Sequence, residues 1–214
     1  MSVEIIGVSE KDAPLTLIGK IAGTSTDKSD SGNPVKRAKS CIKRGHMSVA
    51  EFVTVTFSVT GSRAMTHQLV RHRLASFCQL SQRYVKLNTD DMDWYVTPPS
   101  IDECDEKTPS GTSAKAAFEE AMASAALQYK NLLAAGVRPE DARYVLPNAC
   151  ETTIRVSMNL RELQSFYKLR SDKHAQWEIR DVAEDIKTKL LEYTSDSDEW
   201  QELISLLLVH EEQK

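Results

Sequence analysis

The 214-residue sequence predicts one domain of the α/β (α+β) class, in which helices flank a central, mostly antiparallel sheet. Residues 53–60 and 153–159 alternate between apolar and polar side chains, as half-buried strands do. Residues 113–135 instead carry apolar side chains at the spacing of an amphipathic helix. Because no internal repeat and no linker interrupts these segments, we expect a single domain over residues 1–214.

The N-terminal segment predicts a strand and two helices. Residues 3–8 are a short strand candidate, and residues 14–22 carry apolar side chains at helical spacing. Residues 24–33, rich in Ser, Thr, Asp and Gly, predict a mobile loop. The second helix begins at Pro34, which suits a first helical turn, and ends before Gly45, which suits a C-cap.

The next segment predicts a strand and then a helix with a basic face. The strand places four apolar side chains on one face: Val53, Val55, Phe57 and Val59. The pattern of residues 63–72 predicts a helix, and helical spacing aligns three basic side chains: Arg63, His67 and Arg71. Gln68 and His72 form the adjacent row, so this helix presents a polar, basic wall.

Residues 71–84, RHRLASFCQLSQRY, are a dense polar stretch between apolar segments. Planar guanidinium groups match phosphate oxygens and carbonyl edges, so the stretch indicates a site for an anion and a flat heterocycle. Composition alone fits a solvated basic loop equally well. If residues 79–84 are extended, Gln79, Ser81 and Arg83 point to one side and form, with the helical row, two walls of a pocket.

The C-terminal half predicts three further long elements and several short ones. Residues 86–111 predict a loop with a possible strand at 94–96, and a short helix begins at Pro139. Gly136 caps the helix of residues 113–135, whose core face we expect to be Phe118, Met122, Ala125, Tyr129 and Leu132.

Residues 153–159 predict a strand, and Asn159 with Glu162 predicts a loose capping box for a helix that ends at Arg170. Asp172 is the expected cap of the last long helix. The core face of that helix is expected to be Ile179, Ala183, Ile186, Leu190 and Tyr193. A final helix is expected over residues 199–208.

Composition excludes several classes of protein. The net charge of −4 argues against a nucleic-acid-binding surface, which is usually basic. The four widely spaced cysteines include no CxxC pair, so structural zinc and a disulfide framework are not expected. The N-terminal segment has no signal-peptide pattern, and no apolar run could span a membrane. We therefore expect a cytoplasmic protein with reduced thiols.

Common catalytic motifs are absent from the sequence. Neither GxGxxG nor GxxxxGK[ST] occurs, and the five histidines form no HExxH, so we expect no metal site. Cys78 is open to interpretation as a nucleophile, but beside Phe77 it fits a small packing residue better. Ser81 has no obvious Ser-His-acid partners, which favours a hydrogen-bonding role toward a substrate.

Three segments resemble the flavin-dependent thymidylate synthases and occur in the order found in that family. RHRLASFCQLSQRY at 71–84 resembles the RHRxxS…SxRY signature. GHMS at 45–48 resembles the upstream GHxT/S turn, and LRSDKHAQWEI at 169–179 resembles a downstream segment. The resemblance implies conversion of dUMP to dTMP, with a methylene group from methylenetetrahydrofolate and electrons from NADPH through FAD, without a cysteine nucleophile.

The resemblance also assigns residues to sites. It implies a dUMP site made by Gln68, Leu69, Val70, Arg71, Gln79, Leu80, Ser81, Gln82, Arg83, Arg143 and Arg170. It implies an FAD site made by His46, Ser48, Arg71, His72, Arg73, Gln79, Asn159, Leu160, Arg161, Ser165 and His174. It implies that Arg170 is catalytic, polarising the uracil ring and stabilising its anionic form, because a fixed cation needs no reorganisation during reaction. It further implies a homotetramer with shared active sites.

The chain departs from the family pattern at four positions. Met47 and Cys78 stand where Glu and Asn are common, and Ser165 stands where Asn is usual. Gln79 replaces a frequent Glu, which removes a negative charge but keeps an acceptor, so we expect altered affinity and retained activity. Taken without the resemblance, Arg143 and Arg170 fit surface ion pairs better than catalytic roles.

Two other functions fit the arginine cluster. A non-catalytic nucleotide- or RNA-binding module would bind oligonucleotides with a steep salt dependence, and the acidic net charge disfavours it. A metal-dependent nucleotide hydrolase would lose activity to a chelator, and the missing ligand spacing disfavours it.

Overall fold

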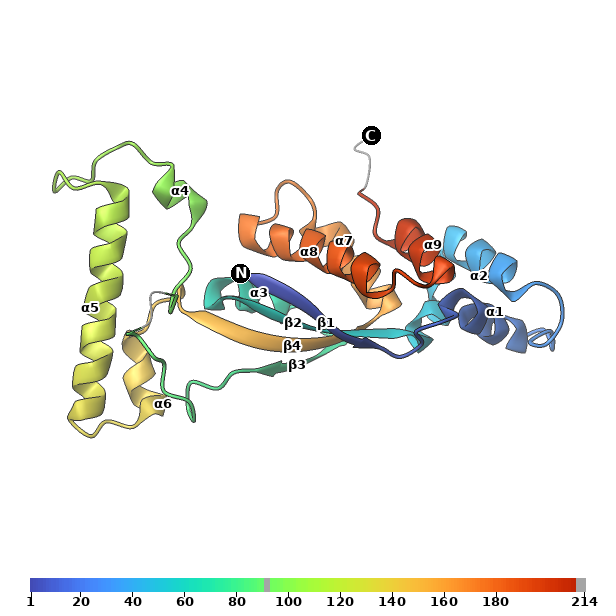
Figure 1. Cartoon of the computed structure of the whole chain (residues 1–214), viewed down its shortest axis with the longest axis horizontal. Helices are drawn as coiled ribbons and strands as arrows, with labels where there is room; N and C mark the ends of the chain where they lie inside the picture. The colour runs from blue at the N-terminus through green and yellow to red at the C-terminus, as the bar shows by residue number, and fades with distance from the viewer. Residues whose placement is uncertain (91–92, 211–214) are drawn as a thin grey trace. The chain divides into compact units, whose positions relative to one another are not determined.

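A computed structural model of the chain describes residues 1–90 and 93–210. Within these residues a four-stranded sheet has the order β1-β2-β4-β3 (Figure 1). The strands are β1 (Ser2–Val8), β2 (Thr54–Ser62), β3 (Ala75–Gln79) and β4 (Glu151–Asn159). The helices are α1 (Pro14–Thr24), α2 (Pro34–Lys43), α3 (Arg63–Leu69), α4 (Pro99–Asp102), α5 (Ala114–Ala134), α6 (Pro139–Ala142), α7 (Leu160–Arg170), α8 (Trp177–Tyr193) and α9 (Asp198–Leu207), with 3-10 turns η1 (Met47–Phe52) and η2 (Arg143–Val145).

The two central strands run antiparallel, as expected from the sequence. The Thr60 hydroxyl lies 3.0 Å from that of Thr153, and the Thr56 hydroxyl lies 3.2 Å from that of Ser157. Residue numbers that rise on β2 therefore fall on β4, which is the register of an antiparallel pair. None of the helices within residues 1–90 and 93–210 is long and apolar enough to cross a membrane.

The chain divides into two compact units, which are described separately. The larger unit holds residues 2–59, 67–78 and the described part of 154–214, and the smaller unit holds residues 60–66, the described part of 79–153 and Met1. The single-domain organisation expected from the sequence stays a prediction.

The core of the larger unit is built on the alternating strands. Val53, Val55, Phe57 and Val59 are fully buried, as the sequence pattern predicted. The expected faces of β4 and α8 are buried as well, except that Tyr193 keeps 38% of its surface exposed at the end of α8. α8 packs on β1, and α1 packs on α2 and α9 (Figure 1). The first of these contacts places a helix against the sheet, and the others join helices to one another.

Helices α1 and α2 approach closely at a glycine. A Cβ built on Gly19 would lie 1.9 Å from the carbonyl oxygen of Pro34, the first residue of α2. The Arg37 guanidinium then donates a 2.8 Å hydrogen bond to the Gly19 carbonyl, which fixes the two helices at this point. Only a residue without a Cβ fits here.

Replacing Gly19 with alanine is therefore expected to lower the free energy of unfolding by ~1–3 kcal/mol, the usual cost of overpacking a core. Alanine favours an isolated helix by about 1 kcal/mol over glycine, but that gain does not offset a backbone clash. Chemical denaturation of Gly19→Ala beside Gly7→Ala measures the difference, because a Cβ on Gly7 meets no heavy atom within 4 Å. Equal losses in the two variants would contradict the close approach.

The smaller unit packs around α5. Ser113 caps this helix by accepting a hydrogen bond from the backbone of Ala116, as its position before the helix suggests. One buried core cluster of this unit consists of Trp94, Met122, Ala126 and Cys150. The Tyr129 hydroxyl accepts a 3.3 Å hydrogen bond from the backbone N–H of Leu87, which attaches the preceding loop to the helix.

Several expected boundaries are wrong. The helix expected over 63–72 ends at Leu69, so Arg71 does not continue the row of Arg63 and His67. The alternation of side chains along 79–84 assumed an extended segment, but these residues are the end of β3 followed by a turn, in which the Ser81 carbonyl accepts hydrogen bonds from Tyr84 and Val85. The predicted alternation of side chains along 79–84 therefore does not exist.

Two further corrections concern caps and short elements. Gln176, and not Asp172, caps α8 by accepting hydrogen bonds from the backbone of Glu178 and Ile179. Asp172 instead accepts a 2.8 Å hydrogen bond from the backbone of His174. In the expected loop of 86–111, of which residues 91 and 92 lie outside the described residues, α4 was not expected and Tyr95 forms only an isolated bridge to Cys150.

Candidate active site

One face of α7 in the larger unit carries a row of three side chains that hold a single histidine. Asn159 begins the helix by accepting a 2.9 Å hydrogen bond from the backbone of Glu162, which confirms the expected cap. Glu162, Phe166 and Arg170 follow at intervals of four residues, so their side chains lie on one helical face. All three contact the ring of His72, which is 7% exposed.

The contacts determine which His72 nitrogen carries the proton. Arg170 Nε donates to His72 Nε2 over 3.1 Å, and a guanidinium has no acceptor, so Nε2 must be unprotonated. The proton then lies on Nδ1, which donates to the Glu162 carboxylate 3.2 Å away. Burial and the neighbouring Arg170 lower the pKa of His72, while Glu162 acts in the opposite direction. These contacts favour the neutral imidazole with its proton on Nδ1.

Arg170 is held at a second point. Its Nη2 donates a 3.2 Å hydrogen bond to the carbonyl oxygen of Gln68, at the end of α3. Burial lowers the pKa of the guanidinium, which nevertheless remains charged because arginine does not deprotonate in proteins. Taken by itself, Arg170 fits a surface ion pair. In the structure its guanidinium instead forms hydrogen bonds to the His72 ring and the Gln68 carbonyl. The arrangement is a partly buried, oriented cation.

The other expected nucleotide residues of the larger unit lie around the end of α3. Gln68 Nε2 donates to Gln176 Oε1 over 3.4 Å, Leu69 is fully buried, and Val70 is 38% exposed. Arg71 is exposed in the turn that follows, where its backbone N–H donates to the Gln68 carbonyl.

The residues expected to bind FAD within the larger unit are mostly exposed donors. They include His46, Ser48, Arg71, Arg73, Arg161, Ser165 and His174. Arg161 lies 2.5 Å from Glu51, and His174 Nδ1 lies 2.8 Å from Asp172. Three other residues expected at the FAD site have structural roles within the chain. Leu160 is buried, Asn159 caps α7, and both ring nitrogens of His72 form hydrogen bonds within the protein.

This set of donors fits a flavin dinucleotide. Exposed guanidinium and imidazole groups can bind a pyrophosphate without first losing buried contacts. Gly45, with φ 77°, ends α2 and places His46 in the exposed turn before η1. The backbone N–H of His46 donates to the Cys41 carbonyl over 2.9 Å, which fixes that turn.

In the smaller unit, two of the expected nucleotide arginines meet at one residue. Arg83 Nε lies 3.4 Å from the Glu140 carboxylate, and Arg143 Nε donates a 3.0 Å hydrogen bond to the Glu140 carbonyl. Burial and the charge of Arg143 lower the pKa of Arg63, so the two guanidinium groups interact electrostatically. The sequence pattern had placed Arg63 with His67 and Arg71, so its proximity to Arg143 was missed.

Gln79 and Ser81, also expected at the nucleotide site, form hydrogen bonds within the smaller unit. Gln79 Nε2 donates to the hydroxyls of Thr66 and Thr152 over 3.1 and 3.4 Å. The Ser81 hydroxyl accepts a 3.2 Å hydrogen bond from the backbone of Arg83. This bond lies within the turn, so the hydrogen-bonding role of Ser81 toward a substrate stays a prediction.

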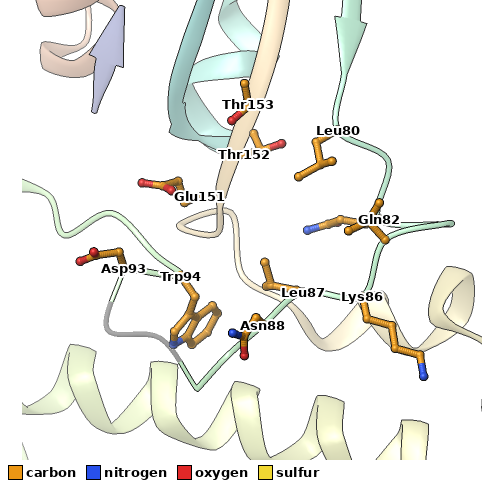
Figure 2. A pocket seen from close by; sticks show the side chains of 11 residues that line it. Leu80, Gln82, Lys86, Leu87, Asn88, Asp93, Trp94, Glu151, Thr152 and Thr153 are labelled. Carbon is orange, nitrogen blue, oxygen red and sulfur yellow. The ribbon is translucent and has the colours of Figure 1, made fainter.

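A pocket of about 380 Å³ lies beside this segment. Figure 2 shows Leu80 and Gln82 on one side of it and the ring of Trp94 on another. Gln82 is 9% exposed, and its Nε2 has no hydrogen-bond partner among the described residues. The expected nucleotide segment therefore borders a space large enough for a small heterocycle, with Leu80 and Gln82 in its wall.

The cysteines and the possible metal ligands bear on the chemistry available to the described residues. Cys78 is exposed on β3, and Cys150 is buried in the core of the smaller unit. Burial raises the pKa of Cys150 to about 11, so this thiol is protonated at neutral pH. Within residues 1–90 and 93–210, no group of three or more His, Cys, Asp or Glu side chains could hold a metal ion.

The sequence matches one protein family and several curated proteins. The family described as "Thymidylate synthase complementing protein" matches residues 8–194. The chain is 47% identical to the flavin-dependent thymidylate synthase of Pyrococcus abyssi over 141 residues, which are 65% of this chain and 55% of that protein. It is 48% identical to that of Geobacter sulfurreducens over 140 residues, which are 65% of this chain and 57% of that protein. The chain thus spans little more than half the length of these relatives.

Among solved structures, the chain is similar to a UMP/dUMP methylase, PolB from Streptomyces cacaoi, bound with 5-Br dUMP. The TM-score is 0.73 at 23% sequence identity, and the match covers 95% of this chain and 94% of that one. This similarity shows a shared fold.

Proposed function

Because the chain belongs to the thymidylate synthase complementing protein family, we propose that it acts as a flavin-dependent thymidylate synthase. The reaction converts dUMP to dTMP, with methylenetetrahydrofolate as the methylene donor and NADPH as the source of electrons. Bound FAD would supply the hydride-transfer chemistry that passes these electrons to the transferred carbon. The observation that carries the proposal is the Arg170 guanidinium, partly buried and attached to His72 and the Gln68 carbonyl.

The chain's own residues bind and polarise the nucleotide in this proposal. Arg170 stabilises negative charge that develops on the uracil ring, and it does so without reorganising because its orientation is already fixed. The remaining substrate contacts come from Gln68, Leu69, Val70, Arg71, Gln79, Leu80, Ser81, Gln82, Arg83 and Arg143. Arg83 and Arg143, which meet at Glu140, supply positive charge suited to the phosphate.

The flavin contacts come from exposed donors of the larger unit, chiefly Arg71, Arg73, Arg161 and His174. The active protein is a homotetramer with shared active sites in this proposal. Its cytoplasmic location also stays a prediction.

A visible absorption spectrum and a product assay test the proposal together. The purified protein is expected to bind FAD and to form dTMP from dUMP only when methylenetetrahydrofolate and NADPH are present. A protein that binds no flavin and forms no dTMP would overturn it. Affinity for oligonucleotides with a steep salt dependence would instead support the nucleotide- or RNA-binding alternative.

A mechanism without a cysteine nucleophile predicts that no single thiol is required. Cys78→Ser and Cys104→Ser replace exposed thiols, and we expect each variant to keep dTMP formation within about 2-fold of the wild type, since surface changes are usually nearly neutral. Cys150→Ala is expected to lower stability, because Cys150 is fully buried, and to keep a measurable rate. Loss of turnover in Cys78→Ser with unchanged folding would show that this thiol takes part in the reaction.

A further inference from the structure

The contact between Arg170 and His72 depends on the tautomer of the imidazole. Arg170 Nε can only donate, so its 3.1 Å hydrogen bond requires a lone pair on His72 Nε2. If Nε2 carried the proton, two N–H groups would face each other and the bond would be lost. The orientation of the guanidinium is therefore linked to the position of one proton on its neighbour.

The position of that proton is set by Glu162. Its carboxylate lies 3.2 Å from His72 Nδ1, and both side chains are at least nine-tenths buried, with 9% and 6% exposed. A buried carboxylate accepts hydrogen bonds and so keeps the proton on Nδ1. The Phe166 ring packs edge-on against the imidazole, with centroids 4.9 Å apart, which restricts rotation of the histidine ring.

We propose that Glu162 is a positioning residue for the reaction: it fixes the Nδ1–H tautomer of His72 and so keeps the Nε2 lone pair available to orient Arg170. This inference rests on the proposed function for its kinetic consequence, although the tautomer itself is a property of the protein alone. It gives Glu162 a role beyond the capping box that its spacing suggested.

The hydrogen bond between Arg170 and His72 is expected to depend on pH, because the imidazole can be protonated. The ionisable groups that face the ring from α7 are Glu162 and Arg170, and the ionisable neighbours of His72 on its own segment are Arg71 and Arg73. Protonation of Nε2 at low pH breaks the bond to Arg170, so turnover is expected to fall as pH drops through the pKa of His72. Glu162 raises that pKa, so removing its charge is expected to move the acid limb to lower pH.

Two substitutions separate the hydrogen bond from the charge. Glu162→Gln keeps an oxygen that accepts from Nδ1, so the tautomer and most of kcat are expected to remain while the acid limb shifts to lower pH. Glu162→Leu removes the acceptor, and we expect kcat to fall about 10- to 100-fold with little change in the KM for dUMP, as small misplacements of catalytic groups do. Glu199→Gln is the matched control, because its carboxylate accepts two hydrogen bonds from Thr16 in the same unit.

Nitrogen NMR of protein labelled with ¹⁵N-histidine observes the tautomer directly, with His72→Gln identifying the signals. The expected wild-type and Glu162→Gln spectra show a protonated Nδ1 and an unprotonated Nε2 at neutral pH, and Glu162→Leu loses this pattern. A wild-type Nε2–H tautomer or imidazolium would overturn the inference, as would Glu162→Leu with unchanged kcat and pH profile. If Glu162→Leu does not fold, the wild-type and Glu162→Gln spectra still decide. A wild-type protein that forms no dTMP would refute the proposed function and leave the spectra as an independent result.

Discussion

Replacing Arg170 with alanine is expected to lower the rate of dTMP formation about 100- to 1,000-fold, the usual effect of removing one preorganised donor at a developing charge. The loss should appear in kcat more than in the KM for dUMP, because the uracil ring becomes anionic only during the reaction. Steady-state kinetics with saturating cofactors, supported by a thermal unfolding curve, measures the effect.

Lys189→Ala is a suitable control for the loss of a cation, since Lys189 is exposed on α8 and pairs with Glu192. This variant is expected to keep the wild-type rate. Arg170→Lys retains the charge but not the guanidinium geometry that bonds both His72 and the Gln68 carbonyl, so we expect it to remain impaired. Wild-type turnover in Arg170→Ala would show that the catalytic cation is another residue.

Replacing Trp200 with alanine is expected to lower the free energy of unfolding by ~3–5 kcal/mol, the usual cost of removing a large buried aromatic side chain. Trp200 on α9 is fully buried, and its indole N–H donates a 2.8 Å hydrogen bond to the Glu10 carbonyl. The substitution therefore leaves both a cavity and an unsatisfied carbonyl. Chemical denaturation at one fixed protein and FAD concentration measures the difference, because ligand and oligomer alter apparent stability.

Leu127→Ala removes an apolar side chain that is 56% exposed on α5, and its expected effect is within about 0.5 kcal/mol. Trp200→Phe keeps most of the apolar volume, so its loss should lie between the two alanine variants. A Trp200→Ala variant as stable as Leu127→Ala would contradict the packing described for α9.

Strands β1, β2 and β4 and the long helices were predictable because burial of one face imposes a regular spacing of apolar residues, whereas β3 was not predicted. Val53, Val55, Phe57 and Val59 face the core together, so their alternation reports β2 directly. Asn159 was predictable as a cap for a similar reason, since a short polar side chain next to a new apolar pattern satisfies the first free N–H groups of a helix. Such signals depend on neighbouring residues alone.

The errors occurred where a local interaction or a distant partner decided the structure. Asp172 has the chemistry of a helix cap but bonds to the backbone of His174, and α8 begins only after Gln176. The helix that should have included Arg71 ends at Leu69, and the ring of His72 lies buried against α7. The pattern of residues 63–72 cannot predict the hydrogen bond between His72 and Glu162, because the two residues lie ninety positions apart in the sequence.

The same distinction applies to the site. The dense polar stretch of 71–84 predicted a site in this part of the sequence, whereas Arg170, taken by itself, favoured an ordinary surface ion pair. Glu162, Phe166 and Arg170 stand at helical spacing in the sequence, so their common face is predictable. Their shared contact with His72 is not, because it depends on the tertiary structure. The proximity of Arg63 to Arg143 likewise depends on how the smaller unit folds.

A single-turnover experiment tests the central claim most directly. Protein loaded with FAD is reduced anaerobically and mixed with dUMP and methylenetetrahydrofolate, while flavin absorbance and dTMP are followed together. The account predicts one dTMP formed for each flavin reoxidised, and almost none in Arg170→Ala within the same time. Flavin that stays reduced while dTMP forms, or that reoxidises without oxygen and without dTMP, would contradict it.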